Sequence, residues 1–500
     1  MAGAPWNNWD IQGKGKKLQA WTNKHVFTDS FDAGGSYGTI NEDPFNAWNS
    51  QNQPQPTITE ERLSMDPIPE SYQNTESGDL SKKEEEEVDP HGSGGQPITA
   101  LQAAWNVTNA IQGMFIVGLP IAVKVGGWWT ILFLIGAAYI CYVTGTLLID
   151  CLYEKNVKVR KSYKDVADAV KPGLGNWVLA AQLLELASTC ILYLVLAGDL
   201  LQGCVPSIDK PAWMMLVSAI LLGTAFIDDI RKVSDISFLN GISHLVINGV
   251  MFLYCLSEFS SWQFSSVTVL PKIKSMPTMI GVVVFGYTSH IFLPALEGSM
   301  EKPQEFRWML KWSHVAAAIF KASFGLIGFL TFGEYTQKEI SNSLPNQTFK
   351  VLINLILVVK ALFSYPLPFY AIVQLLIERF FNKNNKSVFR SCFGGDGSLR
   401  EWALCLRIIL ILFTLFVSLS VPYLIEVMGL IGNITGTMLS FIWPALFHLK
   451  IKGAEGTLTD SERKFDKFVI GFGIFLMVIG VQYSFLELLD EMKASQDVDY

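Results

Sequence analysis

The chain has 500 residues, of which half are hydrophobic and 17% are charged, and its mean hydropathy is +0.31. This composition excludes an ordinary soluble protein and is typical of a polytopic membrane protein. The net charge of −7 averages two unlike regions, a polar stretch over residues 1–97 and a succession of apolar runs over residues 98–490.

The first 97 residues are rich in Gly, Pro, Asn, Ser and acidic residues, a composition that predicts a disordered tail. The first thirty residues lack the apolar segment of a secretory signal peptide, so we expect the tail to stay in the cytosol. Tyr37 and Ile40 fit a Tyr-x-x-apolar endocytic signal, which predicts contact with endocytic sorting machinery. A pattern this short also arises by chance.

Apolar runs long enough to cross the hydrocarbon core as helices follow the tail, and each needs about 20 residues. They predict an all-α polytopic membrane protein with eleven transmembrane helices. The expected spans fall at 99–124, 126–152, 174–203, 211–228, 236–257, 276–299, 308–333, 347–378, 400–421, 423–449 and 466–489.

The basic residues predict the orientation of these spans. With the N-terminus in the cytosol, the inner loops hold about three times as many Lys and Arg residues as the outer loops. Because eleven is odd, the short C-terminus (491–500) is expected on the outer, lumenal side.

Asn346 begins a glycosylation sequon in an outer loop. Cys204 and Cys255 fall at outer helix ends, where they could form a disulfide or pack as free thiols. The seven cysteines show no metal-ligand spacing, so we expect no metal site.

The first span is interrupted in mid-membrane by the segment NAIQGMFIVGLP, residues 109–120. An unpaired backbone group in lipid costs on the order of several kcal/mol, so such a break predicts a cavity whose ligand can pair with it. Free N–H groups at a helix N-terminus suit a carboxylate, and free carbonyls suit an ammonium group. We expect the backbone N–H groups of Gln112, Gly113 and Met114, with the Asn109 side chain, to bind a substrate carboxylate. Asn109 and Gln112 could instead only complete the broken backbone.

The sixth span reads GVVVFGYTSHIFLPALEG over residues 281–298 and also carries a polar run followed by a Leu-Pro step. Interrupted spans in corresponding positions are typical of transporters built from inverted repeats, which bind substrate between the two breaks. We therefore expect Tyr287, Thr288 and Ser289 to contact a substrate amine. The alternative is that Gly and Pro only serve close helix packing.

Three ionisable side chains within the spans are candidates for proton coupling, because such groups are costly in lipid and mark function. Lys360 lies near the middle of the eighth span, with snorkelling toward an interface as its alternative. Glu185 could instead form a structural pair with a lysine such as Lys360, and His290 could serve only as a hydrogen-bonding group. Glu297, Arg407 and Glu426 are interpreted as gate or interface pairs.

The segments WNVTNAIQGMFIVGLPIAVKVGG (105–127), FGYTSHIFLPALEGSM (285–300) and VKALFSYPLPF (359–369) resemble the amino acid/auxin permease family. The similarity runs through nearly all of residues 98–490 and is closest to the vesicular branch, which loads GABA and glycine into synaptic vesicles. The resemblance implies a LeuT-like fold of the amino acid-polyamine-organocation superfamily, with repeat one at about 99–257, repeat two at about 276–449 and an extra helix at about 466–489.

The resemblance also implies antiport of lumenal protons for cytosolic GABA or glycine, and it leaves chloride open as a further partner. In this fold the eighth span faces the first across the site where sodium-coupled relatives hold sodium. We therefore expect the Lys360 ammonium to stand in for that ion and its titration to couple protons to transport. An amide is expected at position 290 in relatives, so His290 is a departure that bears on pH behaviour.

The main alternative is a plasma-membrane, sodium-coupled neutral amino acid transporter of the same family. The Lys360 charge argues against it, because it would compete with sodium. A channel or receptor is not supported by any filter, voltage-sensor or ligand-domain sequence. No nucleophile–base arrangement, nucleotide loop or metal spacing predicts an enzyme, and no cofactor is expected. Anionic lipid and topology explain the basic inner loops, so we expect no nucleic-acid partner.

Overall fold

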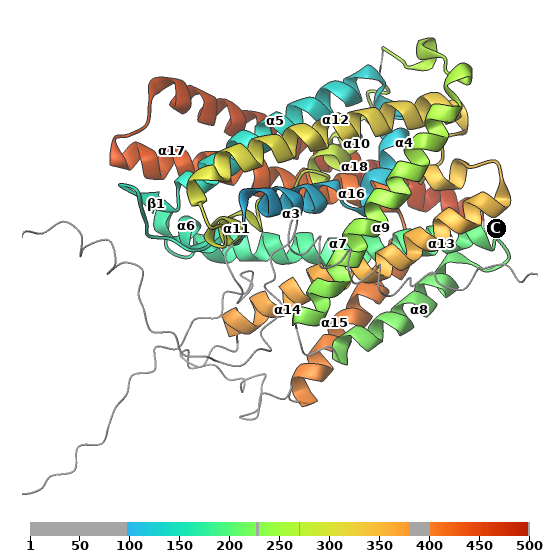
Figure 1. The fold of residues 1–500 in the computed structure, drawn as a ribbon, viewed down its shortest axis with the longest axis horizontal. Helices are drawn as coiled ribbons and strands as arrows, with labels where there is room; N and C mark the ends of the chain where they lie inside the picture. The colour runs from blue at the N-terminus through green and yellow to red at the C-terminus, as the bar shows by residue number, and fades with distance from the viewer. Residues whose placement is uncertain (1–97, 227–229, 270, 381–400, 499–500) are drawn as a thin grey trace, which may run out of the picture.

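A computed structural model describes residues 98–226, 230–269, 271–380 and 401–498. Figure 1 shows an elongated bundle of helices, with the strand β1 and the helices α6 and α17 at one end. The predicted tail, including Tyr37 and Ile40, lies outside the described residues.

The elements of the first half are α3 (Ala100–Gln112), η1 (Met114–Gly118), α4 (Leu119–Gly126), α5 (Trp128–Asp150), β1 (Tyr153–Glu154), β2 (Val157–Lys158), α6 (Tyr163–Val170), α7 (Leu174–Cys204), α8 (Lys210–Leu221), η2 (Leu222–Phe226), α9 (Ile230–Ser257), η3 (Phe259–Ser261) and η4 (Phe264–Ser266). Those of the second half are α10 (Met276–Phe285), α11 (Leu293–Gly298), η5 (Pro303–Glu305), α12 (Phe306–Phe332), η6 (Gly333–Tyr335), η7 (Ile340–Ser343), α13 (Gln347–Ser364), α14 (Pro366–Phe380), α15 (Glu401–Ser420), α16 (Leu424–Ile431), the π-helical η8 (Gly432–Gly436) and η9 (Met438–Ile442), α17 (Trp443–Glu455) and α18 (Asp460–Val498). The strands β1 and β2 form an antiparallel hairpin.

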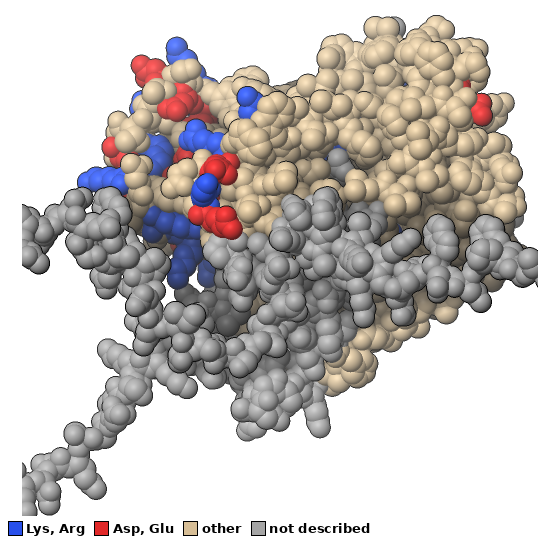
Figure 2. Space-filling view, viewed as in Figure 1, with Lys and Arg blue, Asp and Glu red and all other residues tan. Residues whose placement is uncertain are grey.

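The surface of the bundle is that of a membrane protein. Within the described ranges, seven helical segments are long and apolar enough to cross a bilayer, and shorter apolar helices accompany them. Large apolar side chains such as Trp177, Leu253 and Phe416 are 67–70% exposed, which suits contact with lipid. In Figure 2 the charged residues on the visible face gather at the end that carries β1, α6 and α17, and a broad uncharged band covers most of the rest.

Each expected span falls on one helix or on consecutive helical segments. The last helix is longer than its expected span, because α18 runs from Asp460 to Val498. The chain is therefore a helical polytopic membrane protein. The number of crossings and their orientation stay predictions.

The break in the first span is confirmed. The helix α3 ends at Gln112, Gly113 takes a positive φ of 36°, and after η1 the helix α4 begins at Leu119-Pro120. Because proline lacks an N–H group and has a fixed φ, it suits the first turn of this second half-helix.

The break in the sixth span is confirmed as well. The helix α10 ends at Phe285, and α11 begins at Leu293-Pro294. The two spans therefore share the same order of half-helix, irregular segment and a Leu-Pro start to the second half-helix.

The tenth span contains an irregularity that the sequence analysis did not predict. Its middle is π-helical over η8 and η9, between α16 and α17. Here Gly432 packs against α10 so closely that a Cβ atom on it would lie 1.9 Å from the carbonyl oxygen of Gly281. Only glycine allows this approach, which holds the tenth span against the first half of the broken sixth span.

Candidate functional site

The interruptions of the first and sixth spans lie beside each other. The ring of Phe115, just after the first break, lies 5.5 Å from the ring of Phe285, just before the second. On its other side Phe115 stacks on Tyr193 of α7 at 5.1 Å between ring centroids. The two breaks therefore meet next to α7, as expected for a shared binding site.

The segment between α10 and α11 holds buried polar atoms that no described residue satisfies. These atoms are the hydroxyl oxygens of Tyr287 and Ser289 and Nδ1 of His290, and the three residues are at most 1% exposed. An unsatisfied buried polar group costs about 1–3 kcal/mol, so three in one irregular segment call for an explanation. A polar ligand bound at the break would supply it, which agrees with the predicted roles of Tyr287 and Ser289.

A lysine that the sequence analysis did not single out contacts this break. Lys321 of α12 is 2% exposed, and its ammonium donates a hydrogen bond to the carbonyl oxygen of Gly286. The same ammonium lies 4.1 Å from the ring centroid of Tyr287, a cation–π arrangement. The signal was present in the sequence, because Lys321 is a lone lysine in an apolar run, as Lys360 is.

Glu185 of α7 contacts the same break through hydroxyl groups. Thr435 of η8 donates a hydrogen bond to Glu185 Oε2, and the Thr288 side chain is also hydrogen-bonded to this carboxyl group. Glu185 therefore joins the third span to the broken sixth and irregular tenth spans. The alternative of a structural pair with Lys360 is wrong, because Lys360 has a different partner.

Lys360 of α13 is buried at 4% exposure, so the alternative of snorkelling is wrong. Its ammonium is hydrogen-bonded to Nδ1 of His244 on α9, and Asn248 lies 3.0 Å from the same ring. The polar contact thus faces the fifth span rather than the first, because α13 packs against α7 and α9. The sequence analysis missed His244.

Two further histidines lie at the break. Nε2 of His290 lies 3.0 Å from Thr144 Oγ1 of α5, so the hydrogen-bonding role anticipated for His290 is confirmed on this side of its ring. His314 of α12 stacks on Tyr287, with 6.4 Å between ring centroids and 17° between planes. Its Nδ1 lies 2.9 Å from the carbonyl oxygen of Leu310.

The carboxylate-binding residues and the sequon of the sequence analysis have different outcomes. Nothing is described for the side chains of Asn109, Gln112 and Met114, so their contacts with a carboxylate stay a prediction. Asn346 is exposed and its side-chain oxygen caps α13 by accepting a hydrogen bond from the Phe349 N–H at 3.0 Å.

The possible disulfide between Cys204 and Cys255 is not formed. Both residues are free thiols in the structure, which is the other alternative that the sequence left open. Cys204 at the end of α7 faces the Val351 carbonyl of α13 at 3.8 Å. The backbone carbonyl of Cys255 at the end of α9 instead accepts a hydrogen bond from Thr331 of α12 at 3.4 Å. The two residues thus contact different helices.

The charged residues near the helix ends form the expected pairs. Glu297 of α11 pairs with Lys158 of β2 at 2.6 Å, and Glu426 of α16 pairs with Lys338 at 3.0 Å. Arg407 lies over the ring of Tyr370, with 5.3 Å from its guanidinium carbon to the ring centroid. The interpretation of Glu297 and Glu426 as paired groups is confirmed.

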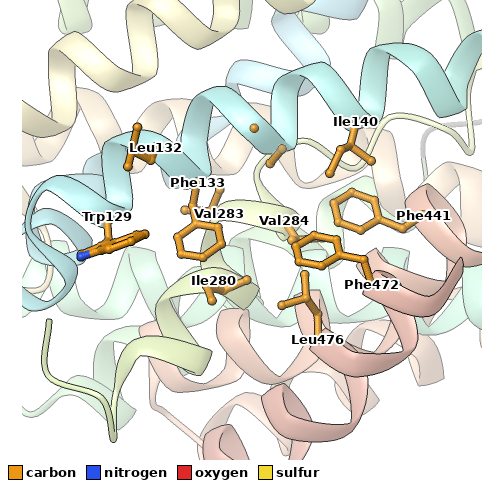
Figure 3. A pocket seen from close by; sticks show the side chains of 12 residues that line it. Trp129, Leu132, Phe133, Ile140, Ile280, Val283, Val284, Phe441, Phe472 and Leu476 are labelled. Atoms are coloured by element: carbon orange, nitrogen blue, oxygen red, sulfur yellow. The ribbon is translucent and has the colours of Figure 1, made fainter. Parts of the chain in front are cut away.

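A cavity of about 220 Å³ lies elsewhere, between α5, α10, η9 and α18. Figure 3 shows apolar side chains converging on it, including Phe133, Val284 and Phe472. Trp129 and Leu132 on its rim are 45% and 60% exposed on the apolar surface. A lining of this kind offers nothing to the charged ends of an amino acid, so the cavity is not the candidate site.

A comparison with known protein families identifies the class of this protein. The profile of the family "Transmembrane amino acid transporter protein" matches residues 96–486. The chain belongs to this family. The transporter is 60% identical to the vesicular GABA transporter of Caenorhabditis elegans over 96% of this chain and 98% of the relative. It is 43% identical to the human vesicular inhibitory amino acid transporter, over 71% of this chain and 70% of that protein. A solved structure of Mhp1 in an inward-facing conformation covers 78% of this chain and 90% of its own, with a TM-score of 0.46 and 11% identity.

Proposed function

We propose that the transporter moves GABA and glycine from the cytosol into synaptic vesicles in exchange for lumenal protons. The observation that carries this proposal is the break between α10 and α11. There the hydroxyl oxygens of Tyr287 and Ser289 and Nδ1 of His290 are buried without partners among the described residues. The vesicular names of its relatives in worm and human support the substrate and the compartment.

The substrate lies between the two breaks, with its ends held by opposite kinds of backbone group. The backbone N–H groups at the start of η1, beginning with Met114, bind the carboxylate, because Gln112 ends α3, where a helix leaves carbonyl rather than N–H groups unpaired. The sixth-span break binds the ammonium through carbonyl and hydroxyl oxygens. The rings of Phe115 and Phe285 are in contact where the two breaks meet. A substrate such as GABA, whose charges stand apart, can span the two breaks.

The proposed orientation places the hairpin β1–β2 and the helices α6 and α17 in the cytosol. The basic loops of residues 155–171, 302–311 and 450–467 support this side, and Figure 2 shows blue side chains gathered at the same end. Eleven crossings, two inverted repeats and a lumenal C-terminus complete the topology. In it Asn346 lies in the lumen, where its exposed side chain can accept a glycan.

Proton coupling rests on ionisable groups buried around the site. Lys360, held against His244 of the fifth span, supplies a buried cation whose titration couples protons to transport. Glu185 and His290 lie at the sixth-span break and are further proton carriers. The proposal leaves open whether chloride is transported together with the substrate.

Reconstitution into liposomes tests the proposal and its sodium-coupled alternative together. Purified transporter is placed in vesicles, and uptake of labelled GABA and glycine is measured under two driving forces, an acidic lumen and an inside-positive voltage. The two are imposed together and each alone. Each condition is repeated with and without sodium and chloride. We expect accumulation that requires the proton gradient and is indifferent to sodium. Uptake that requires sodium and ignores the pH gradient would establish the alternative instead.

A further inference from the structure

The contacts of Lys321 set it apart from the other buried charges of the site. Its ammonium is held by the Gly286 carbonyl oxygen and by the face of the Tyr287 ring, both at the sixth-span break. Gly286 leaves room for it, because a Cβ atom at that position would lie 3.0 Å from Lys321 Nζ. The lysine thus reaches the backbone at the point where α10 stops.

That position is the one a substrate ammonium needs. The last carbonyls of a helix have no partner within it and carry the negative end of its dipole, so they attract cations. An aromatic face adds to this attraction. The Lys321 ammonium and the ammonium of an amino acid carry the same charge and require the same oxygen, so the two exclude each other.

We propose that Lys321 is a tethered competitor of the substrate ammonium at the Gly286 carbonyl, and that this competition contributes one proton to the exchange. The inference rests on the proposed function and adds the group that makes binding of proton and substrate mutually exclusive. Facing the cytosol, the Lys321 ammonium gives one proton to water, and the neutral amine leaves the carbonyl to the substrate. Facing the lumen, the substrate departs, and the amine takes one proton from lumenal water and returns to the carbonyl.

The surroundings of Lys321 are compatible with this alternation. The ionisable groups that face it from α5, α9, the break and α12 itself are Cys141, His244, Tyr287 and His314. None of these described neighbours is a carboxylate, so loss of the proton breaks no ion pair. Glu185 reaches the same break through Thr288, from α7.

Two substitutions separate the charge of Lys321 from its size. Lys321→Met keeps the length of the side chain and removes the competitor, whereas Lys321→Arg makes the charge permanent. Lys311→Met is the matched control, because Lys311 lies on the same helix with an exposed side chain. GABA affinity of the purified proteins is measured from pH 5 to 8, together with GABA counterflow and proton-driven accumulation in liposomes.

We expect wild-type affinity to fall as the medium is acidified, by up to about tenfold per pH unit where one proton competes with one substrate. Lys321→Met should bind GABA with an affinity that no longer depends on pH, and it should retain counterflow while losing accumulation. Lys321→Arg should bind at least about tenfold more weakly across the range, and Lys311→Met should match wild type.

Lys321→Met with the wild-type pH slope, or Lys321→Arg with wild-type affinity, would overturn the inference. The arginine result stands even where the methionine variant does not fold, because the buried cation is retained. Wild-type protein that binds GABA with this pH dependence but fails to accumulate it under a pH gradient would instead refute the proposed antiport and leave the competition at Lys321 in place.

Discussion

The ammonium of Lys158 lies 2.6 Å from Oε2 of Glu297, which ties the hairpin β1–β2 to α11, the second half of the broken sixth span. The hydroxyl of Tyr153 donates a second hydrogen bond to the same carboxylate. Burial, and then Glu297 itself, holds the pKa of the Tyr153 phenol above its usual range, so it remains a donor at physiological pH. Glu297 is 1% exposed, and we hypothesise that this buried contact is a latch that holds the hairpin end of the bundle closed.

Replacing Glu297 by Gln should favour the conformation open at the hairpin end by about tenfold, or about 1.4 kcal/mol. A charge-assisted hydrogen bond contributes about 1.5–3 kcal/mol, and the partial exposure of Lys158 lowers this value. The measurement is the rate at which an impermeant thiol reagent, added on the hairpin side, modifies the variant Ser289→Cys with and without Glu297→Gln. Tyr153→Phe, which keeps the ion pair, should have a smaller effect. Equal rates in all backgrounds would rule out the latch.

Glu339, in the loop between α12 and α13, should make that end of the bundle more stable at acidic pH. Burial, and then the nearby Asp199 carboxylate, raises the pKa of Glu339 to about 8 from an ordinary value of 4.5, although Asn342 donates a hydrogen bond to it. Between these pH values the folded state binds more protons than the unfolded state. Its contribution to stability is therefore complete below pH 4.5 and is lost as the pH rises toward 8.

From pH 5.5 to pH 7.5 this loss amounts to at most about 2–3 kcal/mol. Glu339→Gln should flatten the pH dependence of the thermal unfolding midpoint measured over this range. The matched control is Glu334→Gln in the same loop, whose side chain is 84% exposed and should leave the slope unchanged. A Glu339→Gln curve that parallels wild type would show that Glu339 is not the group that titrates.

Glu185→Gln should separate proton coupling from binding. The amide can still accept the hydrogen bond from Thr435, so we expect the fold and GABA counterflow to persist. Accumulation driven by an acidic lumen should fall at least about tenfold, because the amide cannot carry a proton. Glu258→Gln at the exposed end of α9 is the control and should accumulate GABA normally. Undiminished accumulation by Glu185→Gln would remove Glu185 from the coupling path.

Lys360→Met should lower proton-driven uptake at least about tenfold, because it deletes a buried ionisable group proposed to carry a proton. It also removes one of the two described hydrogen-bond partners of His244 Nδ1, and the other, the side-chain amide of Asn248 at 3.0 Å, remains. Uptake and the unfolding midpoint are compared with Lys350→Met, which changes a half-buried lysine at the start of the same helix. Full proton-driven uptake by Lys360→Met would contradict the assigned role.

Gly113→Ala should destabilise the break in the first span by about 1–2 kcal/mol, because Gly113 has a φ of +36° that side chains disfavour. Space is not the cause, since the nearest atom to an added Cβ is the Ala110 carbonyl oxygen at 3.8 Å. Gly136→Ala in the interior of α5, where nothing lies within 4 Å, is the control and should be neutral or stabilising. A Gly113→Ala protein as stable as wild type would show that the break does not need glycine.

The features that depend on local pattern could be predicted from the amino-acid sequence. The apolar runs predict the helices. The Gly, Pro and polar residues of 109–120 and 281–298 predict both breaks, because interrupting a helix in lipid is costly and such residues are rarely placed there without a purpose. Lys360 is a candidate because it is a lone lysine in an apolar run, and Lys321 meets the same criterion.

The hydrogen-bond partners of the buried charged residues are seen only in the three-dimensional packing of the helices. His244 is 116 residues from Lys360, and Thr435 is 250 residues from Glu185. Which residues meet depends on the rotation and crossing of whole helices, and those follow from packing summed over the bundle rather than from any short stretch. The π-helical middle of the tenth span begins at Gly432, where the backbone lies close to α10, and this contact too joins residues far apart in the chain.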